Sequence, residues 1–200
     1  MGITERRQRQ KEEVRTSILN AAWKLVEAEG WQLLSIRKIA DAIEYSVPVI
    51  YVHFENKEAI LLEFTKCGFQ HLNEALLEAS DKLTASETQI EAIAYAYWDF
   101  AFKNKEYYQL MYGLGMPGCE TVNQTEELKT FTQIVMKPIQ DLIGKSNNKE
   151  TDAILKLHTF WSMLHGLISI NMMSKDDTRD KMNAMVLKDF IKGFIYGIKS

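Results

Sequence analysis

The chain has 200 residues, of which 46% are hydrophobic and 26% charged, with a formal net charge of −3. This composition is ordinary for a globular protein, and the charge gives no overall basic character of the kind that nucleic-acid-binding proteins often have. The longest apolar stretch, 160–173, is too short to span a bilayer. The two cysteines, Cys67 and Cys119, predict no disulfide framework. The polar N-terminal residues lack a signal-peptide pattern, so we expect a cytoplasmic protein.

Helix-forming residues dominate the chain, which contains only 3 prolines and 10 glycines. No segment alternates over a useful strand length, so the sequence predicts an all-α fold of about nine helices. Residues 1–57 hold nine Lys/Arg against eight Asp/Glu, including a basic cluster before the first predicted helix: Arg6, Arg7, Arg9 and Lys11. Such an arm can follow phosphates or enter a minor groove. A frayed, solvated terminus is an equally good interpretation.

Residues 35–58 carry the most informative pattern. An apolar stripe at helical spacing consists of Ile36, Ile39, Ala40 and Ile43. Ser35 is placed to cap this helix and Ser46 to cap the next, with Pro48 in the first turn that Ser46 opens. Two short helices joined by a tight turn predict a helix-turn-helix, whose second helix enters the DNA major groove. An ordinary helical hairpin is the alternative. Polar side chains around the second helix favour DNA binding.

This segment resembles the N-terminal DNA-binding domain of the TetR/AcrR family of bacterial regulators, over roughly the first 60 residues. The matching residues are Ile18, Ala21, Ala22, Leu25, Gly30, Ile39-Ala40, Ser46, Ile50-Tyr51-Val52-His53-Phe54 and Asn56-Lys57-Glu58. The family usually has glycine in the turn, at the place of Glu44. Because a non-glycine residue is uncomfortable at positive φ, we expect this turn to be shaped differently.

The DNA contacts that we expect fall into two groups. Phosphates would be bound by Tyr51, His53 and Lys57, with Ser35 at a helix start. Base edges would be reached by Arg37, Ser46, Val47 and Val49, with Pro48 against a thymine methyl group. The apolar start of the recognition helix favours contacts with thymine methyl groups over bidentate hydrogen bonds.

Beyond this domain, which we place at 1–56, the sequence predicts a helical regulatory domain at 57–200. Its expected helices are 57–80, 84–103, 105–111, 122–143, 149–174 and 178–199. Asn56 caps the first, Ser86 with Gln89 has capping-box spacing in the second, and the fourth is expected to bend near Pro138. A loop is expected at 113–118.

The last two predicted helices are apolar on more than one face. One stripe is Leu157, Trp161, Leu164 and Ile168; the other is Met182, Val186, Phe190 and Phe194. Additional apolar residues lie outside these stripes: Leu155, Ile170, Ile191, Ile195 and Ile198. Such helices are buried on more than one side, which indicates contact with a second subunit. The resemblance implies a homodimer through these helices. The interface residues that we expect are Gly166, Ile170, Phe190, Gly193, Phe194 and Gly197.

Large side chains between these regions are interpreted as an effector pocket or as plain core. The family senses small, mostly hydrophobic molecules here, and apolar cavities with a few polar groups bind such ligands. The expected lining is Phe64, Cys67, His71, Trp98, Phe102, Tyr107, Met111, Met116, Trp161 and His165. The run Trp161-Ser-Met-Leu-His165-Gly166 also resembles a Trp…His-Gly (WHG) subset of the family.

Cys67 and His71 have metal-ligand spacing, but a lone pair is weak evidence, and a histidine beside a buried thiol is the better interpretation. We expect no metal and no cofactor. Enzyme motifs are missing from the sequence: it has no glycine-rich phosphate loop, no His-Glu-x-x-His and no nucleophile elbow.

The sequence therefore predicts a ligand-responsive regulator that binds double-stranded DNA at an operator. We expect a repressor released by a small hydrophobic molecule. An activator on the same fold is one alternative. A helical small-molecule enzyme or carrier with a vestigial DNA-binding unit is the other.

Overall fold

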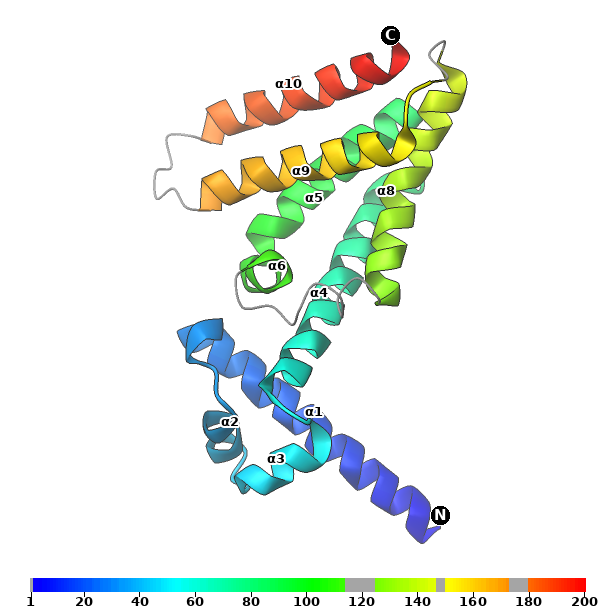
Figure 1. Cartoon of the computed structure of the whole chain (residues 1–200). Coiled ribbons are helices and arrows are strands. Elements are labelled where there is room, and N and C mark those ends of the chain that lie inside the picture. The colour runs from blue at the N-terminus through cyan, green and yellow to red at the C-terminus, as the bar shows by residue number, and fades with distance from the viewer. Residues whose placement is uncertain (1, 114–124, 147–149, 173–179) are drawn as a thin grey trace. The chain divides into compact units, whose positions relative to one another are not determined.

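The computed structural model describes residues 2–113, 125–146, 150–172 and 180–200 (Figure 1). In these residues the chain forms nine α-helices, one short 3-10 helix and no strand, so the predicted all-α fold is confirmed. Two compact units emerge: unit 1 comprises Met1–Cys67 and Glu106–Val122, and unit 2 comprises Gly68–Lys105 and Asn123–Ser200. The functional boundary that we place after residue 56 stays a prediction. Most of the loop expected at 113–118, with Met116 and Cys119, lies outside the described residues.

Unit 1 contains the helix-turn-helix. It is built from α1 (Ile3–Glu29), a 3-10 helix (Trp31–Leu33), α2 (Ile36–Ala42), α3 (Val47–His53), the start of α4 (Lys57–Ser80) and most of α6 (Lys105–Tyr112). α2 and α3 pack on each other and on α1 (Figure 1). The core that joins them consists of Ile18, Ala22, Val26, Leu34, Ile39, Ala40, Ile50, Phe54, Ile60, Leu61, Phe64 and Leu110. The basic cluster near the N-terminus is helical and belongs to α1.

Two of the predicted caps in unit 1 are confirmed. Ser35 Oγ accepts a hydrogen bond from the Lys38 N–H at 3.3 Å, and Asn56 Oδ1 accepts one from the Ala59 N–H at 2.8 Å. Ser46 occupies the N-cap of α3, but its side chain accepts no hydrogen bond there. Pro48 takes a first-turn position, where its missing N–H costs little.

The turn between α2 and α3 keeps the left-handed conformation. Glu44 has φ 58°, so the expectation of a differently shaped turn was wrong. The physical reason is local: the Tyr45 N–H donates to the Ala40 carbonyl at 3.0 Å and closes the turn. The Glu44 side chain itself is exposed.

Unit 2 contains the remainder of α4 with α5 (Ser86–Lys103), α8 (Glu126–Lys145), α9 (Ala153–Met172) and α10 (Asp180–Lys199). α5 packs against α8, α9 and α10, and α9 runs beside α10 in the opposite direction (Figure 1). Its fully buried side chains include Phe69, Leu72, Leu76, Ile90, Ile93, Tyr97, Ile139, Phe160 and Ile168. No described helix is both long enough and apolar enough to cross a membrane.

The capping box predicted for α5 was wrong. Ala85 holds the N-cap, and Ser86 is the first residue of the helix. Ser86 Oγ instead accepts a hydrogen bond from Lys145 Nζ at 3.3 Å, while Gln89 Nε2 donates to the Leu83 carbonyl at 2.9 Å. The ammonium comes from α8, far along the chain, so a tertiary contact replaces the local one.

The buried face of α10 also differs from the predicted stripe. Leu187, Ile191, Phe194 and Ile198 are buried, whereas Met182 is 60% exposed and Val186 is 41% exposed. Phe194 is the member of the predicted stripe that is buried, and its ring centroid lies 5.1 Å from that of Phe160 on α9. Burial of Leu157, Leu164 and Ile168 on α9 agrees with the prediction.

Candidate nucleic-acid interface and hollows of unit 2

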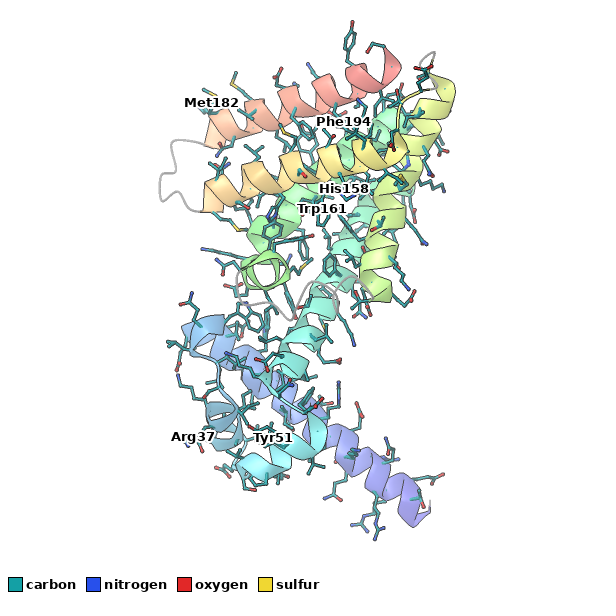
Figure 2. The ribbon with its side chains drawn as sticks, viewed as in Figure 1. Arg37, Tyr51, His158, Trp161, Met182 and Phe194 are labelled. Carbon is teal, nitrogen blue, oxygen red and sulfur yellow. The ribbon has the colours of Figure 1, made fainter. Side chains whose placement is uncertain are left out.

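The outer face of α3 is open to solvent. Tyr51 is 52% exposed and Val52 is 68% exposed, while Ile50, on the inner side of the same helix, is fully buried. Arg37, Ser46 and Pro48 are also exposed. Figure 2 labels Arg37 on α2 and Tyr51 on α3. The core therefore holds α3 by its inner side and leaves its outer side for a partner.

Other residues predicted to contact DNA have roles inside unit 1 as well. Val47 is half-buried and packs against the core of unit 1. Val49, the other valine expected to reach a base edge, is not among the residues packed on that core. Lys57 Nζ lies 3.5 Å from the Trp31 carbonyl oxygen. Ser35 uses its hydroxyl as a cap. Val52 was missed as a candidate, although its i+3 spacing from Val49 places it on the same side of the helix.

His53 lies at the end of α3 near basic residues of α1. Its Nδ1 is buried and has no hydrogen-bond partner among the described residues. Burial lowers the pKa of His53, and the charges of Lys11 and Arg15 lower it further, against an opposing effect of Glu12. The basic side of α1 therefore adjoins the helix that we expect to enter the major groove.

Arg15 connects three elements of unit 1. Its Nη2 donates to Glu63 Oε2 at 2.7 Å, and its guanidinium carbon lies 4.9 Å from the centroid of the Phe54 ring. Glu63 Oε1 accepts a further bond from Lys66 Nζ at 3.1 Å. Burial opposes ionisation of Glu63, but the bonds from Arg15 and Lys66 outweigh it and lower the pKa of this carboxyl group.

Some residues predicted to bind effector belong to the packed interior of unit 1. Phe64 and Tyr107 contact Trp23, with ring centroids 5.6 and 4.2 Å away. Met111 is buried and Cys67 half-buried. Burial raises the pKa of Tyr107, and the charges of Cys67 and Glu27 raise it further.

The predicted residues in unit 2 lie in several places. Trp98 and Phe102 contact each other on α5, with ring centroids 4.8 Å apart. His165 Nε2 lies 3.4 Å from Ser169 Oγ on the same helix, and burial lowers the pKa of this histidine. Trp161 donates its indole N–H to the Tyr97 hydroxyl at 3.2 Å. Whether any of these residues binds effector stays a prediction.

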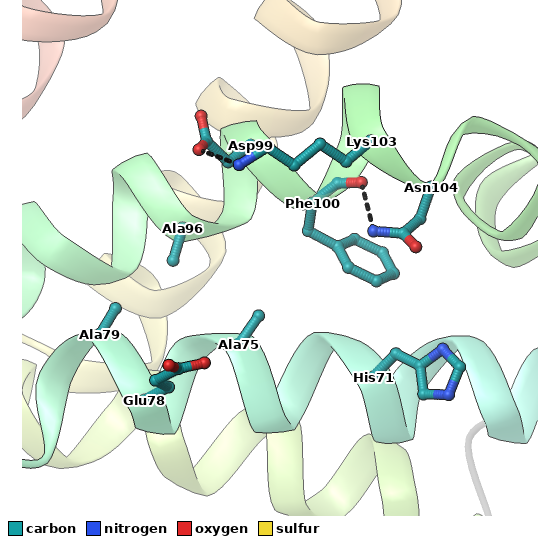
Figure 3. Close-up of a pocket in the computed structure, with 9 residues that line it drawn as sticks. All are labelled: His71, Ala75, Glu78, Ala79, Ala96, Asp99, Phe100, Lys103 and Asn104. Atoms are coloured by element: carbon teal, nitrogen blue, oxygen red, sulfur yellow. Dashed lines mark hydrogen bonds and ion pairs between the residues drawn. The ribbon is translucent and has the colours of Figure 1, made fainter.

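One hollow of unit 2, of about 400 Å³, lies between α4 and α5 (Figure 3). Small alanine side chains from both helices, Ala75 and Ala96 among them, make room for this hollow, and the ring of Phe100 points into it. Glu78 of α4 and Asp99 of α5 also line the hollow, and Asp99 forms an ion pair with Lys103 over 2.8 Å. The predicted residue His71 lines this hollow.

A second hollow, of about 320 Å³, lies between α8 and α9. Its lining includes Leu128, Lys129, Phe131, Leu157, His158 and Trp161. Trp161, which the sequence predicts to bind effector, is therefore one of the residues that line this hollow. Figure 2 labels His158 and Trp161 on α9.

The outer faces of α9 and α10 are unusually apolar. Exposed large apolar side chains on these helices are Ile154, Leu155, Met163, Ile170, Met182, Met185, Val186 and Tyr196. A Cβ atom added to Gly166 or Gly193 would meet nothing within 4 Å. Phe194, in contrast, is 7% exposed and packs inside its own unit, beside the half-buried Phe190.

A helix-turn-helix that presents the outer face of its second helix is typical of DNA-binding transcriptional regulators. Family models agree. Residues 18–64 match the model described as bacterial regulatory proteins, tetR family, and residues 90–185 match the tetracyclin repressor-like C-terminal domain. The chain belongs to the TetR family.

Individual relatives are also transcriptional regulators. The chain is 27% identical over 137 residues to the Staphylococcus aureus biofilm operon negative regulator IcaR, covering 68% of this chain and 67% of IcaR. It is 24% identical over 169 residues to the transcriptional activator FasR of Mycolicibacterium smegmatis, covering 82% and 71%. Bacillus subtilis FadR, solved in complex with stearoyl-CoA, has the same fold with a TM-score of 0.67 at 17% identity, covering 92% of this chain and 97% of FadR.

Proposed function

We propose that this protein is a homodimeric repressor that binds a double-stranded DNA operator and is released by a small hydrophobic effector. The observation that carries the DNA-binding part is the solvent-exposed outer face of α3, where Tyr51 and Val52 are more than half exposed. The similarity to IcaR, a negative regulator, supports repression.

Dimerisation is supported by the apolar outer faces of α9 and α10. A helix-turn-helix dimer reaches two half-sites when its recognition helices lie about 34–36 Å apart, one turn of DNA. Exposed apolar side chains such as Ile170 and Tyr196 would be removed from water in such a dimer. The uncovered Gly166 and Gly193 would let facing helices approach closely.

Effector response would act as a population shift between two helix arrangements. α4 is one continuous helix whose first part, to Cys67, belongs to unit 1 and whose remainder belongs to unit 2. An effector that prefers one arrangement of unit 2 can bias unit 1 through this helix, by no more than its differential affinity for the two arrangements. The stearoyl-CoA complex of FadR supports a hydrophobic effector.

The test begins with selection of genomic fragments by the full-length protein, followed by electrophoretic mobility measurements and a promoter reporter. We expect one palindromic site, bound by dimers, and higher reporter expression when the protein is deleted. Val52→Asp should abolish binding because it places a carboxylate against the duplex, whereas Leu33→Asp, at another exposed apolar site of unit 1, should retain it.

The other outcomes identify the alternatives. Lower reporter expression on deletion would indicate an activator, which the similarity to FasR favours. Failure to select any DNA, together with turnover of a bound compound, would indicate the enzyme or carrier.

A further inference from the structure

We propose that the hollow between α8 and α9 is the effector site and that it selects an amphipathic anion, an alkyl chain ending in a carboxylate or phosphate. This inference rests on the proposed function for its regulatory meaning. Binding itself can be tested separately.

The walls of the hollow suit a hydrocarbon chain. Phe131 and Leu157 are buried, and Leu128 and Trp161 flank them from the two helices. The Phe131 and Trp161 rings lie 5.9 Å apart at 61°, which turns two aromatic surfaces at an angle around the space. A volume of about 320 Å³ falls in the range of small-ligand sites.

Internal hydrogen bonds occupy the donors deep in the hollow. The Trp161 indole N–H is donated to Tyr97, and the Thr132 hydroxyl donates to the Leu128 carbonyl at 2.9 Å. These groups therefore offer little to a ligand headgroup. The polar side chains left at the rim are Lys129 from α8 and His158 from α9.

The rim favours negative charge. No carboxylate belongs to the described lining of this hollow, and Lys129 supplies an ammonium group with three donors. Lys129 forms one ion pair, with Glu126 at 2.7 Å, but both partners are more than half exposed, so that pair is weak and can be shared. The hollow between α4 and α5 differs, because Glu78 and Asp99 line it.

The experiment is calorimetric titration of the full-length protein with decanoate, decyl phosphate, decanol and decylamine, below their micelle concentrations. We expect decanoate or decyl phosphate, or both, to bind about tenfold more tightly than decanol. Decylamine should bind more weakly still. The two anions identify the headgroup. Tryptophan emission should change on binding in the wild type, and this change should be smaller in Trp161→Phe.

A matched pair of variants tests the site. Lys129→Gln should reduce anion affinity to that of decanol, whereas Lys103→Gln, which removes a similarly paired exposed lysine from the other hollow, should leave it unchanged. Thr132→Phe should fill the hollow and weaken every ligand. Thermal unfolding checks that each variant is folded.

Equal affinity for all four probes, or loss of anion binding in Lys103→Gln alone, would overturn the inference. Operator binding without ligand is measured in parallel. A protein that binds either anion but no DNA refutes the proposed function while leaving the ligand site intact. A protein that binds DNA but neither anion refutes only the site.

Discussion

Arg15 of α1 and Glu63 of α4 form an ion pair over 2.7 Å, although 48 positions separate them in sequence. The same guanidinium covers the ring of Phe54, the C-cap residue that follows α3. The Arg15 side chain therefore contacts both the first turns of α4 and the C-cap of α3. This contact adds a polar link between the recognition helix and the helix that continues into unit 2, beside the core that both helices share.

Glu63→Gln should destabilise the protein by about 1 kcal/mol near neutral pH, because a paired, partly buried charge is removed. The folded-state pKa of Glu63 lies below its ordinary value of 4.5, so this stabilisation is present above 4.5 and is lost as pH falls through the folded-state pKa. Urea unfolding at several pH values measures the difference. Asp99→Asn, from an exposed pair, should change stability little. An equal loss in both variants would contradict the prediction.

Lys57→Ala should weaken operator binding about equally for all sequences and reduce the salt slope by roughly one unit, because one phosphate contact is lost. Binding measured by fluorescence anisotropy at several salt concentrations provides the slope. Lys188→Ala, an exposed lysine on α10, is the control and should leave the slope unchanged. A changed base preference in Lys57→Ala would assign this residue a different role.

Val49→Thr should alter which operator bases are preferred while leaving the dimer intact. Threonine keeps the shape of valine but adds a hydroxyl group that can donate to or accept from a base edge. Sequencing of a randomised operator library before and after selection measures the preference. Val47→Thr should mainly reduce stability, since Val47 packs on the core. Identical libraries for wild type and Val49→Thr would remove Val49 from base recognition.

Operator affinity should fall as pH rises through the pKa that His53 has in the complex. In the free protein, burial and the charges of Lys11 and Arg15 lower the pKa of His53. A bound phosphate would raise that pKa, so binding takes up a proton. The gain in affinity is fully present below the free-state pKa and is lost above the bound-state pKa. His53→Gln should flatten this dependence. A His53→Gln profile parallel to wild type would show that another group titrates.

Ile170→Glu and Tyr196→Glu should convert dimers to monomers, because each would bury an unpaired charge in the proposed interface. Both side chains are more than 60% exposed in the single chain, so the fold itself should tolerate the change. Leu33→Glu in unit 1 is the control. Sedimentation velocity measures the assembly state, and undiminished dimers in both variants would place the interface elsewhere.

Local patterns predicted unit 1 well and unit 2 less completely. The caps made by Ser35 and Asn56 depend on residues three positions away, so the sequence alone predicts them. Ser86 failed as a cap because its partner, Lys145, arrives from another helix. The prediction of the buried face of α10 failed because residues on both sides of this helix are apolar. Packing of α10 on α5, α8 and α9, a tertiary property, selects the buried face.

The left-handed Glu44 also has a consequence for how this protein tolerates heat. A side chain in that conformation costs about 1–2 kcal/mol relative to the right-handed region, a sizeable fraction of the 5–15 kcal/mol that typically separates folded from unfolded domains. Glycine at this position would relieve the strain without touching any core side chain. The DNA-binding unit is therefore less stable than its turn could allow, and the single surface substitution Glu44→Gly should recover part of that free energy of unfolding.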